Sequence, residues 1–109
     1  MALDHAQPLD IINVQPLAGK LQDVKTHSLL KTGKLQLMRL VLAADQSVPE
    51  HQVPGEITIQ CLEGQAVVST PGLSRTLGAG ELMALSGGEP HALKATTAAS
   101  LLVTILLNP

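Results

Sequence analysis

The sequence predicts an all-β protein, and three observations support this fold class. Turn signals built from glycine and proline recur at intervals of roughly 8–12 residues, a spacing typical of β-sandwiches and barrels. The segments between them alternate apolar and polar residues, as half-buried strands do. No segment carries the apolar stripe of an amphipathic helix. The 109 residues suit one domain, with a strand or loop arm at residues 1–30 and a barrel core at residues 31–109.

The N-terminal part has the weakest pattern. Residues 10–14 and 27–30 could each form a strand, and residues 16–23 could form a loop or one short helical turn. Residues 34–42 have a period near two and branched apolar side chains, which predicts a strand. Residues 43–50 read AADQSVPE and are interpreted as a loop.

The second half of the chain has clearer strand patterns. Residues 56–62 read EITIQCL and place Ile57, Ile59 and Cys61 on one face of the predicted strand. The last strand is nearly all apolar, which suits a strand covered on both faces. The further strands that we expect, this last one included, are at residues 65–70, 73–77, 81–85, 91–96 and 100–107.

Composition excludes several classes of partner. The net charge is -2, and no basic run is present that would attract nucleic acid or an anionic membrane. The chain has no Phe, Tyr or Trp, so it offers no platform for stacking bases. We therefore expect neither nucleic acid nor a membrane as a partner.

The single cysteine and the N-terminal residues predict a cytoplasmic protein. Cys61 has no second cysteine with which to form an intrachain disulfide. The N-terminus lacks the basic start and apolar run of a signal peptide, and the apolar stretch at residues 101–107 is too short to span a bilayer. Small size, 45% hydrophobic residues and the edge strands of a small barrel predict a homodimer.

Two spaced motifs suggest a family. Residues 80–95 read GELMALSGGEPHALKA, where Gly80, Gly88 and His91 keep the spacing of the pattern G-x5-P-x-G-x2-H-x3-N. Ser86 and Ala95 stand at the Pro and Asn positions of that pattern.

The other pattern, G-x5-H-x-H-x(3,4)-E-x6-G, fits the preceding segment, so it is the first motif along the chain and residues 80–95 are the second. Anchored at Gly64, it puts His51 at the first histidine, Val53 at the second and Ile57 at the glutamate. Both patterns are those of the cupins, which the chain therefore resembles over about residues 45–95. This resemblance implies a jelly-roll barrel, also called a double-stranded β-helix.

A second alignment of the first motif is open. It places His51 at the second histidine and Glu56 at the glutamate, with Pro49 at the first histidine. Seven residues rather than six then precede Gly64, so a bulge is needed. We prefer the gapless alignment, which turns Ile57 inward and Glu56 outward.

The resemblance implies a barrel cavity in which histidines and a carboxylate hold a divalent transition metal such as Zn, Fe, Mn or Ni. Only His51 and His91 remain of that set in the preferred alignment, and Cys61 lies about 13 Å along the strand from position 57. We therefore expect a small organic ligand in a pocket formed by residues of both motifs: His51, Val53, Ile57, Ile59 and His91.

Two other functions stay open, and no catalytic residue is assigned. One is a metal-dependent enzyme of the dioxygenase or isomerase type, with His51 and His91 as metal ligands and Glu56 added in the second alignment. The other is metal-free acid–base chemistry with His91 as the general base. Outside the pocket, we expect Cys61 to be a small buried hydrophobe, and His5 and His27 to lie on the surface.

Overall fold

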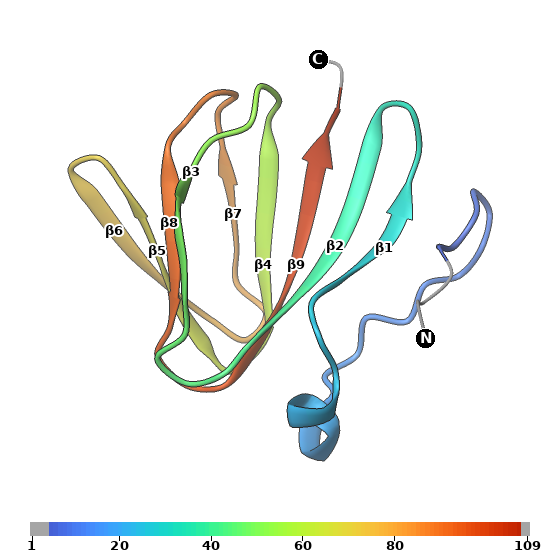
Figure 1. Ribbon diagram of the computed structural model, residues 1–109, viewed down its shortest axis with the longest axis horizontal. Helices are drawn as coiled ribbons and strands as arrows, with labels where there is room; N and C mark the ends of the chain where they lie inside the picture. The colour runs from blue at the N-terminus through green and yellow to red at the C-terminus, as the bar shows by residue number, and fades with distance from the viewer. Residues whose placement is uncertain (1–4, 108–109) are drawn as a thin grey trace.

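The computed structural model describes residues 5–107, so the predicted domain of residues 1–109 extends at both ends beyond the described part. The described residues form nine strands and one short 3-10 helix, η1 (Ala18–Asp23) (Figure 1). The strands are β1 (His27–Lys31), β2 (Leu35–Leu42), β3 (Ser47–His51), β4 (Ile57–Glu63), β5 (Gln65–Thr70), β6 (Leu73–Gly78), β7 (Leu82–Leu85), β8 (His91–Ala95) and β9 (Ala99–Leu106).

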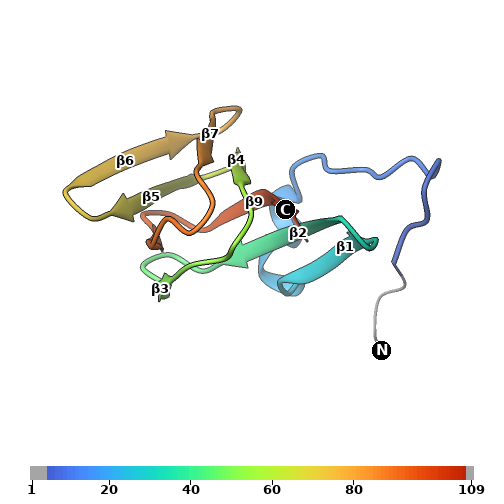
Figure 2. The same ribbon diagram turned by 90° about the horizontal axis from the view of Figure 1, so that it is seen from above.

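The strands form two antiparallel sheets that enclose the interior of a barrel. The five-stranded sheet has the order β1-β2-β9-β4-β7, and the four-stranded sheet has the order β3-β8-β5-β6. Viewed from above, the two sheets face one another and the N-terminal arm lies on the side away from the four-stranded sheet (Figure 2). The predicted all-β jelly-roll class is confirmed.

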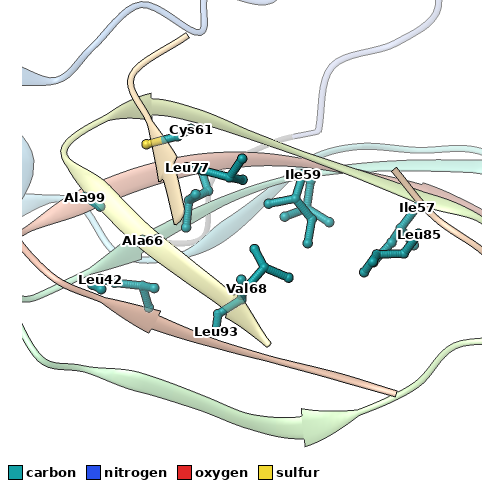
Figure 3. Packing of buried hydrophobic residues seen from close by; sticks show 13 residues of the cluster. Leu42, Ile57, Ile59, Cys61, Ala66, Val68, Leu77, Leu85, Leu93 and Ala99 are labelled. Atoms are coloured by element: carbon teal, nitrogen blue, oxygen red, sulfur yellow. The ribbon is translucent and has the colours of Figure 1, made fainter. Parts of the chain in front are cut away.

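The core forms because alternate residues of the central strands point inward. In β4, Ile57, Ile59 and Cys61 are buried, while the residues between them are only partly buried. Their partners across β9 are Ile105, Val103 and Leu101, which share the same inward face. The inward face of β4 is thus the one that the gapless alignment predicts. A cluster of thirteen buried aliphatic and small side chains from both sheets forms the core on the inward faces of the strands (Figure 3).

Gly64 occupies a turn that no other residue fits. Its φ of +78° lies in the left-handed region, which L side chains rarely adopt. A Cβ placed on it would lie 2.1 Å from the carbonyl oxygen of Ala98. Gly80 and Gly88 of the second motif also have positive φ. The three motif glycines thus lie in turns or bends, in line with the glycine-based turn signals of the sequence.

The structure differs from the sequence predictions in two places. Residues 43–50 were expected to be a loop, but β3 occupies Ser47–His51 as an edge strand bonded only to β8. Its residues are mostly exposed and include Pro49, so no apolar alternation marks it. Residues 10–14 form no strand, whereas residues 16–23 contain the short helical segment η1.

Among residues 5–107, no helix is long and apolar enough to cross a lipid bilayer.

Candidate functional site

A cavity of about 220 Å³ lies inside the barrel, between the two sheets. All five predicted pocket residues line it: His51, Val53, Ile57, Ile59 and His91. None of its lining side chains is a carboxylate, lysine or arginine. The two imidazole rings are therefore its main polar groups, set in an aliphatic wall.

The fold brings the two histidines together directly. His51 ends β3 and His91 begins β8, and the two residues lie opposite each other across the antiparallel ladder. Their ring centroids are 4.3 Å apart and the ring planes are tilted by 55°. His91 is only 3% exposed, whereas His51 is exposed at the end of its strand. One ring is thus deep in the cavity and the other lies where the cavity meets solvent.

Backbone contacts orient both rings. Nδ1 of His51 lies 3.0 Å from the carbonyl oxygen of Pro49, and Nδ1 of His91 lies 2.9 Å from that of Glu89. A carbonyl oxygen only accepts hydrogen bonds, so in the neutral rings the proton is on Nδ1 and Nε2 carries a free lone pair. His27, outside the cavity, makes the same contact with the carbonyl of Lys25. The contact alone therefore does not indicate a functional site. What distinguishes His51 and His91 is that two such rings lie together in one cavity.

Sequence reasoning missed the other half of the cavity wall. The missed residues come from both sheets: Met38, Leu40, Val48, Leu93, Val103 and Ile105. Met38 is partly buried against the core. Period-two alternation in the strands at 34–42 and 100–107 could have nominated the residues of β2 and β9, since only one face of each strand turns inward.

The remaining candidates lie outside the cavity. Glu56 is exposed and borders a shallow groove on the outer side of the five-stranded sheet, beside Thr58 and Thr104. Cys61 is fully buried, and its thiol lies 3.4 Å from the carbonyl oxygens of Glu63 and Gly64. Burial raises the pKa of this thiol, which disfavours the nucleophilic thiolate. The interpretation of Cys61 as a small buried residue is confirmed.

The donor set is small for a metal. Within residues 5–107, no group of three or more His, Cys, Asp or Glu side chains is placed to hold one ion. Catalytic zinc sites use three protein ligands and leave one position open. The two imidazoles alone do not match that pattern.

Outside the cavity, two charged side chains of the barrel form hydrogen bonds with the N-terminal arm. The Glu63 carboxylate accepts hydrogen bonds from the backbone N–H of Leu17 at 2.8 Å and of Ala18 at 2.9 Å. It also accepts one from the Ser100 hydroxyl at 2.5 Å. These hydrogen bonds favour the ionised carboxylate. The two from Leu17 and Ala18 also hold the start of η1 against the end of β4. Neither the arm contact nor its residues were predicted from the sequence.

The second side chain that binds the arm is Arg39 on β2. Its guanidinium donates hydrogen bonds to the carbonyl oxygens of Val14 and Gln15, although the residue is almost fully buried. Burial lowers the pKa of Arg39, and the nearby negative charge of Glu63 acts in the opposite direction. Burial would raise the pKa of Glu63, but its hydrogen bonds and Arg39 together hold that pKa below its ordinary value of 4.5. We call Arg39 and Glu63 the arm clamp.

A larger hollow of about 650 Å³ lies between η1 and the loops at residues 43–46 and 98. Lys25 is the one ionisable side chain among its lining residues. It brings together no pair of polar side chains comparable to the two imidazoles. The barrel cavity is therefore the better candidate site.

Comparison with known proteins supports the fold. No protein-family model matches this sequence, and no curated protein matches it. A cupin superfamily protein from Desulfitobacterium hafniense has a TM-score of 0.78 at 17% identity, over 94% of this chain and 100% of that chain. A protein of unknown function from Streptococcus pyogenes has a TM-score of 0.77 at 21% identity, over 100% and 99%.

An RmlC-like cupin from Desulfovibrio desulfuricans has a TM-score of 0.69 at 20% identity, over 95% of this chain and 96% of that chain. Identities at this level show the fold alone. The resemblance first found in the two spaced motifs is confirmed at that level: this chain has the fold of the cupin superfamily, as a small single barrel.

Proposed function

We propose that the protein binds a small, mainly aliphatic organic molecule inside the barrel, with His51 and His91 as its polar anchors. The observation that carries the proposal is an apolar cavity in which two paired imidazoles are the main polar groups. The proposal places this binding in the cytoplasm, because the one cysteine cannot form an intrachain disulfide.

The cavity limits the size of the ligand. Its 220 Å³ equal about seven water volumes at ~30 Å³ each. This is below the ~300–1,000 Å³ of pockets that take drug-sized molecules. Since the chain has no Phe, Tyr or Trp, the wall offers aliphatic contact and no ring stacking other than on the imidazoles. A saturated or branched carbon skeleton suits this wall.

The ring orientation limits the polar groups of the ligand. With Nδ1 directed at a backbone carbonyl, each neutral ring offers Nε2 as a hydrogen-bond acceptor. The ligand should therefore carry a donor, such as a hydroxyl or an N–H group. A ligand that can only accept would leave the buried His91 nitrogen without a partner, which costs affinity.

A matched pair of probes tests this requirement. Cyclohexanol and cyclohexanone have the same skeleton, but only the alcohol donates a hydrogen bond. We expect calorimetric titration to show cyclohexanol binding roughly three- to tenfold more tightly, the range that one net hydrogen bond supplies. The His91→Ala variant should lose this preference.

His27→Ala is the matched control, because His27 makes the same local backbone contact outside the cavity. It should keep the preference for the alcohol. Equal affinity for the two probes in the native protein, or an unchanged preference in His91→Ala, would contradict the proposal.

A second candidate function is a two-histidine metal site completed by water or by the ligand. The observation in its favour is that two rings whose Nδ1 atoms face carbonyls lie together, with centroids 4.3 Å apart, since a carbonyl contact at Nδ1 leaves Nε2 as the nitrogen to bind a metal. Zn, Fe, Mn and Ni are the ions to test.

Elemental analysis of tag-free protein distinguishes the two functions. If the second candidate is right, one transition metal per chain should copurify and be lost in His51→Ala, with His27→Ala again as the control. If added Zn, Fe, Mn or Ni binds no more tightly to the native protein than to His51→Ala, the metal candidate fails and the organic ligand remains.

A further inference from the structure

We propose that a hollow between the N-terminal arm and the five-stranded sheet binds a phosphate group, either as free phosphate or as the phosphoryl end of a small molecule. The hollow has a volume of about 320 Å³. It is formed by the arm, η1 and β2, and its lining residues are Asn13, Gln15, Pro16, Leu17, Lys20 and Arg39. None of these residues lines the barrel cavity, so this site is separate from the one proposed there.

Arg39 carries the proposal because its guanidinium is buried but only partly bonded. Its neighbours on β2, Met38 and Leu40, line the barrel cavity, so the Arg39 side chain points to the outer side of the sheet, under the arm. Arg39 is only 4% exposed. Both arm carbonyls, of Val14 and Gln15, accept their hydrogen bonds from the same nitrogen, Nη2.

The other nitrogens of this guanidinium remain to donate to a ligand. A guanidinium carries N–H donors on every nitrogen. Within residues 5–107, Nε of Arg39 is the one buried side-chain nitrogen or oxygen that has no hydrogen-bond partner. Such orphaned buried donors are few in native proteins, and a bound ion is one of their recognised explanations. An oxyanion in the adjoining hollow is the acceptor that this guanidinium needs.

The charges around the hollow favour an anion. Lys20 of η1 is a second cation in its lining, and the described lining residues include no carboxylate. Glu63 is the negative charge that acts on Arg39, but it does not line the hollow. Its oxygens already accept hydrogen bonds from two backbone N–H groups and the Ser100 hydroxyl. A bound anion would give Arg39 a negative partner in direct contact, which offsets part of the cost of burying its charge.

The uncharged polar groups of the hollow also supply donors. The side-chain oxygen of Asn13 accepts a hydrogen bond from the N–H of Gln15 at 2.9 Å, so its amide nitrogen is left to donate. The side chain of Gln15 adds a second amide. Guanidinium, ammonium and amide donors together suit a phosphate, which has more acceptor oxygens than a carboxylate and matches the planar fork of arginine.

Calorimetric titration of the full chain with inorganic phosphate, at constant ionic strength, tests the proposal. We expect one phosphate to bind per chain, and acetate to bind at least threefold more weakly because it offers fewer oxygens. Lys20→Gln should weaken phosphate binding by roughly three- to fivefold, the upper range for an exposed ion pair. Lys94→Gln is the matched control, since it removes the same charge from an exposed position on β8 of the other sheet. Its phosphate affinity should equal that of the native protein.

Arg39→Lys tests the guanidinium itself. It keeps the positive charge but loses the planar set of donors, so phosphate binding should fall at least tenfold. If this buried substitution impairs folding, Lys20→Gln still decides the test, because Lys20 is exposed.

Glycerol 3-phosphate distinguishes the two sources of the phosphate group. Tighter binding than inorganic phosphate identifies the phosphoryl end of a small molecule as the ligand, and equal or weaker binding identifies free phosphate. The proposal is overturned if neither compound binds, if acetate binds as tightly as phosphate, or if Lys94→Gln weakens binding as much as Lys20→Gln.

Discussion

Replacing Leu101 with alanine is expected to lower the free energy of unfolding by about 3–4 kcal/mol. Leu101 is fully buried on β9, where it lies opposite Cys61 on one side and Leu40 on the other. Removing its branched end leaves a void that the two flanking strands cannot close, because both strands are paired with β9 at this position. Urea unfolding followed by far-UV circular dichroism measures the loss, since the chain has no Trp or Tyr for fluorescence.

Leu73→Ala is the control for this experiment. Leu73 is half-exposed at the start of β6, so its truncation should cost less than about 1 kcal/mol. A similar loss in both variants would show that the interior around β9 is not the close-packed core described above.

The Glu63→Ala variant is expected to lose about 2–4 kcal/mol at neutral pH. The change removes the acceptor for two backbone N–H groups and for the buried Ser100 hydroxyl. It also takes away the negative charge near the buried Arg39. The arm should loosen at the same time, so trypsin should cleave after Lys20 in η1 faster than in the native protein.

The contribution of Glu63 should depend on pH in a defined direction. Its pKa in the folded protein lies below the ordinary 4.5, so folding favours the ionised carboxylate. The stabilisation is complete above pH 4.5 and is lost as the pH falls through the folded pKa. The difference in unfolding free energy between native protein and Glu63→Gln should therefore shrink as the pH falls below 4.5.

Glu81→Ala serves as the control carboxylate. Glu81 accepts one hydrogen bond from the N–H of Gly78 in an exposed turn, so its loss should be under about 1 kcal/mol. Equal effects of Glu63→Ala and Glu81→Ala, or a Glu63→Gln difference that is constant with pH, would contradict the clamp.

The sequence predicts the barrel and its histidines where the determinants are local. The alternation in residues 56–62 identifies the buried face of β4, and the spacing from Gly80 to His91 places the histidine at the start of β8. Gly64 is equally predictable, since a turn with positive φ and a near backbone contact accepts only glycine. In each case, residues close together in the sequence determine the local structure.

The arm clamp and the far wall of the cavity are not local. Arg39 bonds to residues 24 and 25 positions earlier, and Glu63 bonds to residues 45 and 46 positions earlier. Such contacts depend on how β2 and β4 are placed around β9, which no short segment encodes. β3 was missed for another reason: an exposed edge strand has no buried face, so its sequence lacks the alternation that reveals a strand.

The contact between the His51 and His91 rings makes the protein its own spectroscopic probe. With no Phe, Tyr or Trp, the carbon-bound aromatic protons of the chain belong only to its four histidines. Two of those rings touch each other inside the cavity, so their protons should exchange nuclear Overhauser magnetisation with one another. Any molecule that enters the barrel must shift these few resolved signals. A one-dimensional proton NMR spectrum of unlabelled protein can therefore report occupancy of the cavity, ring by ring, without an added dye or isotope.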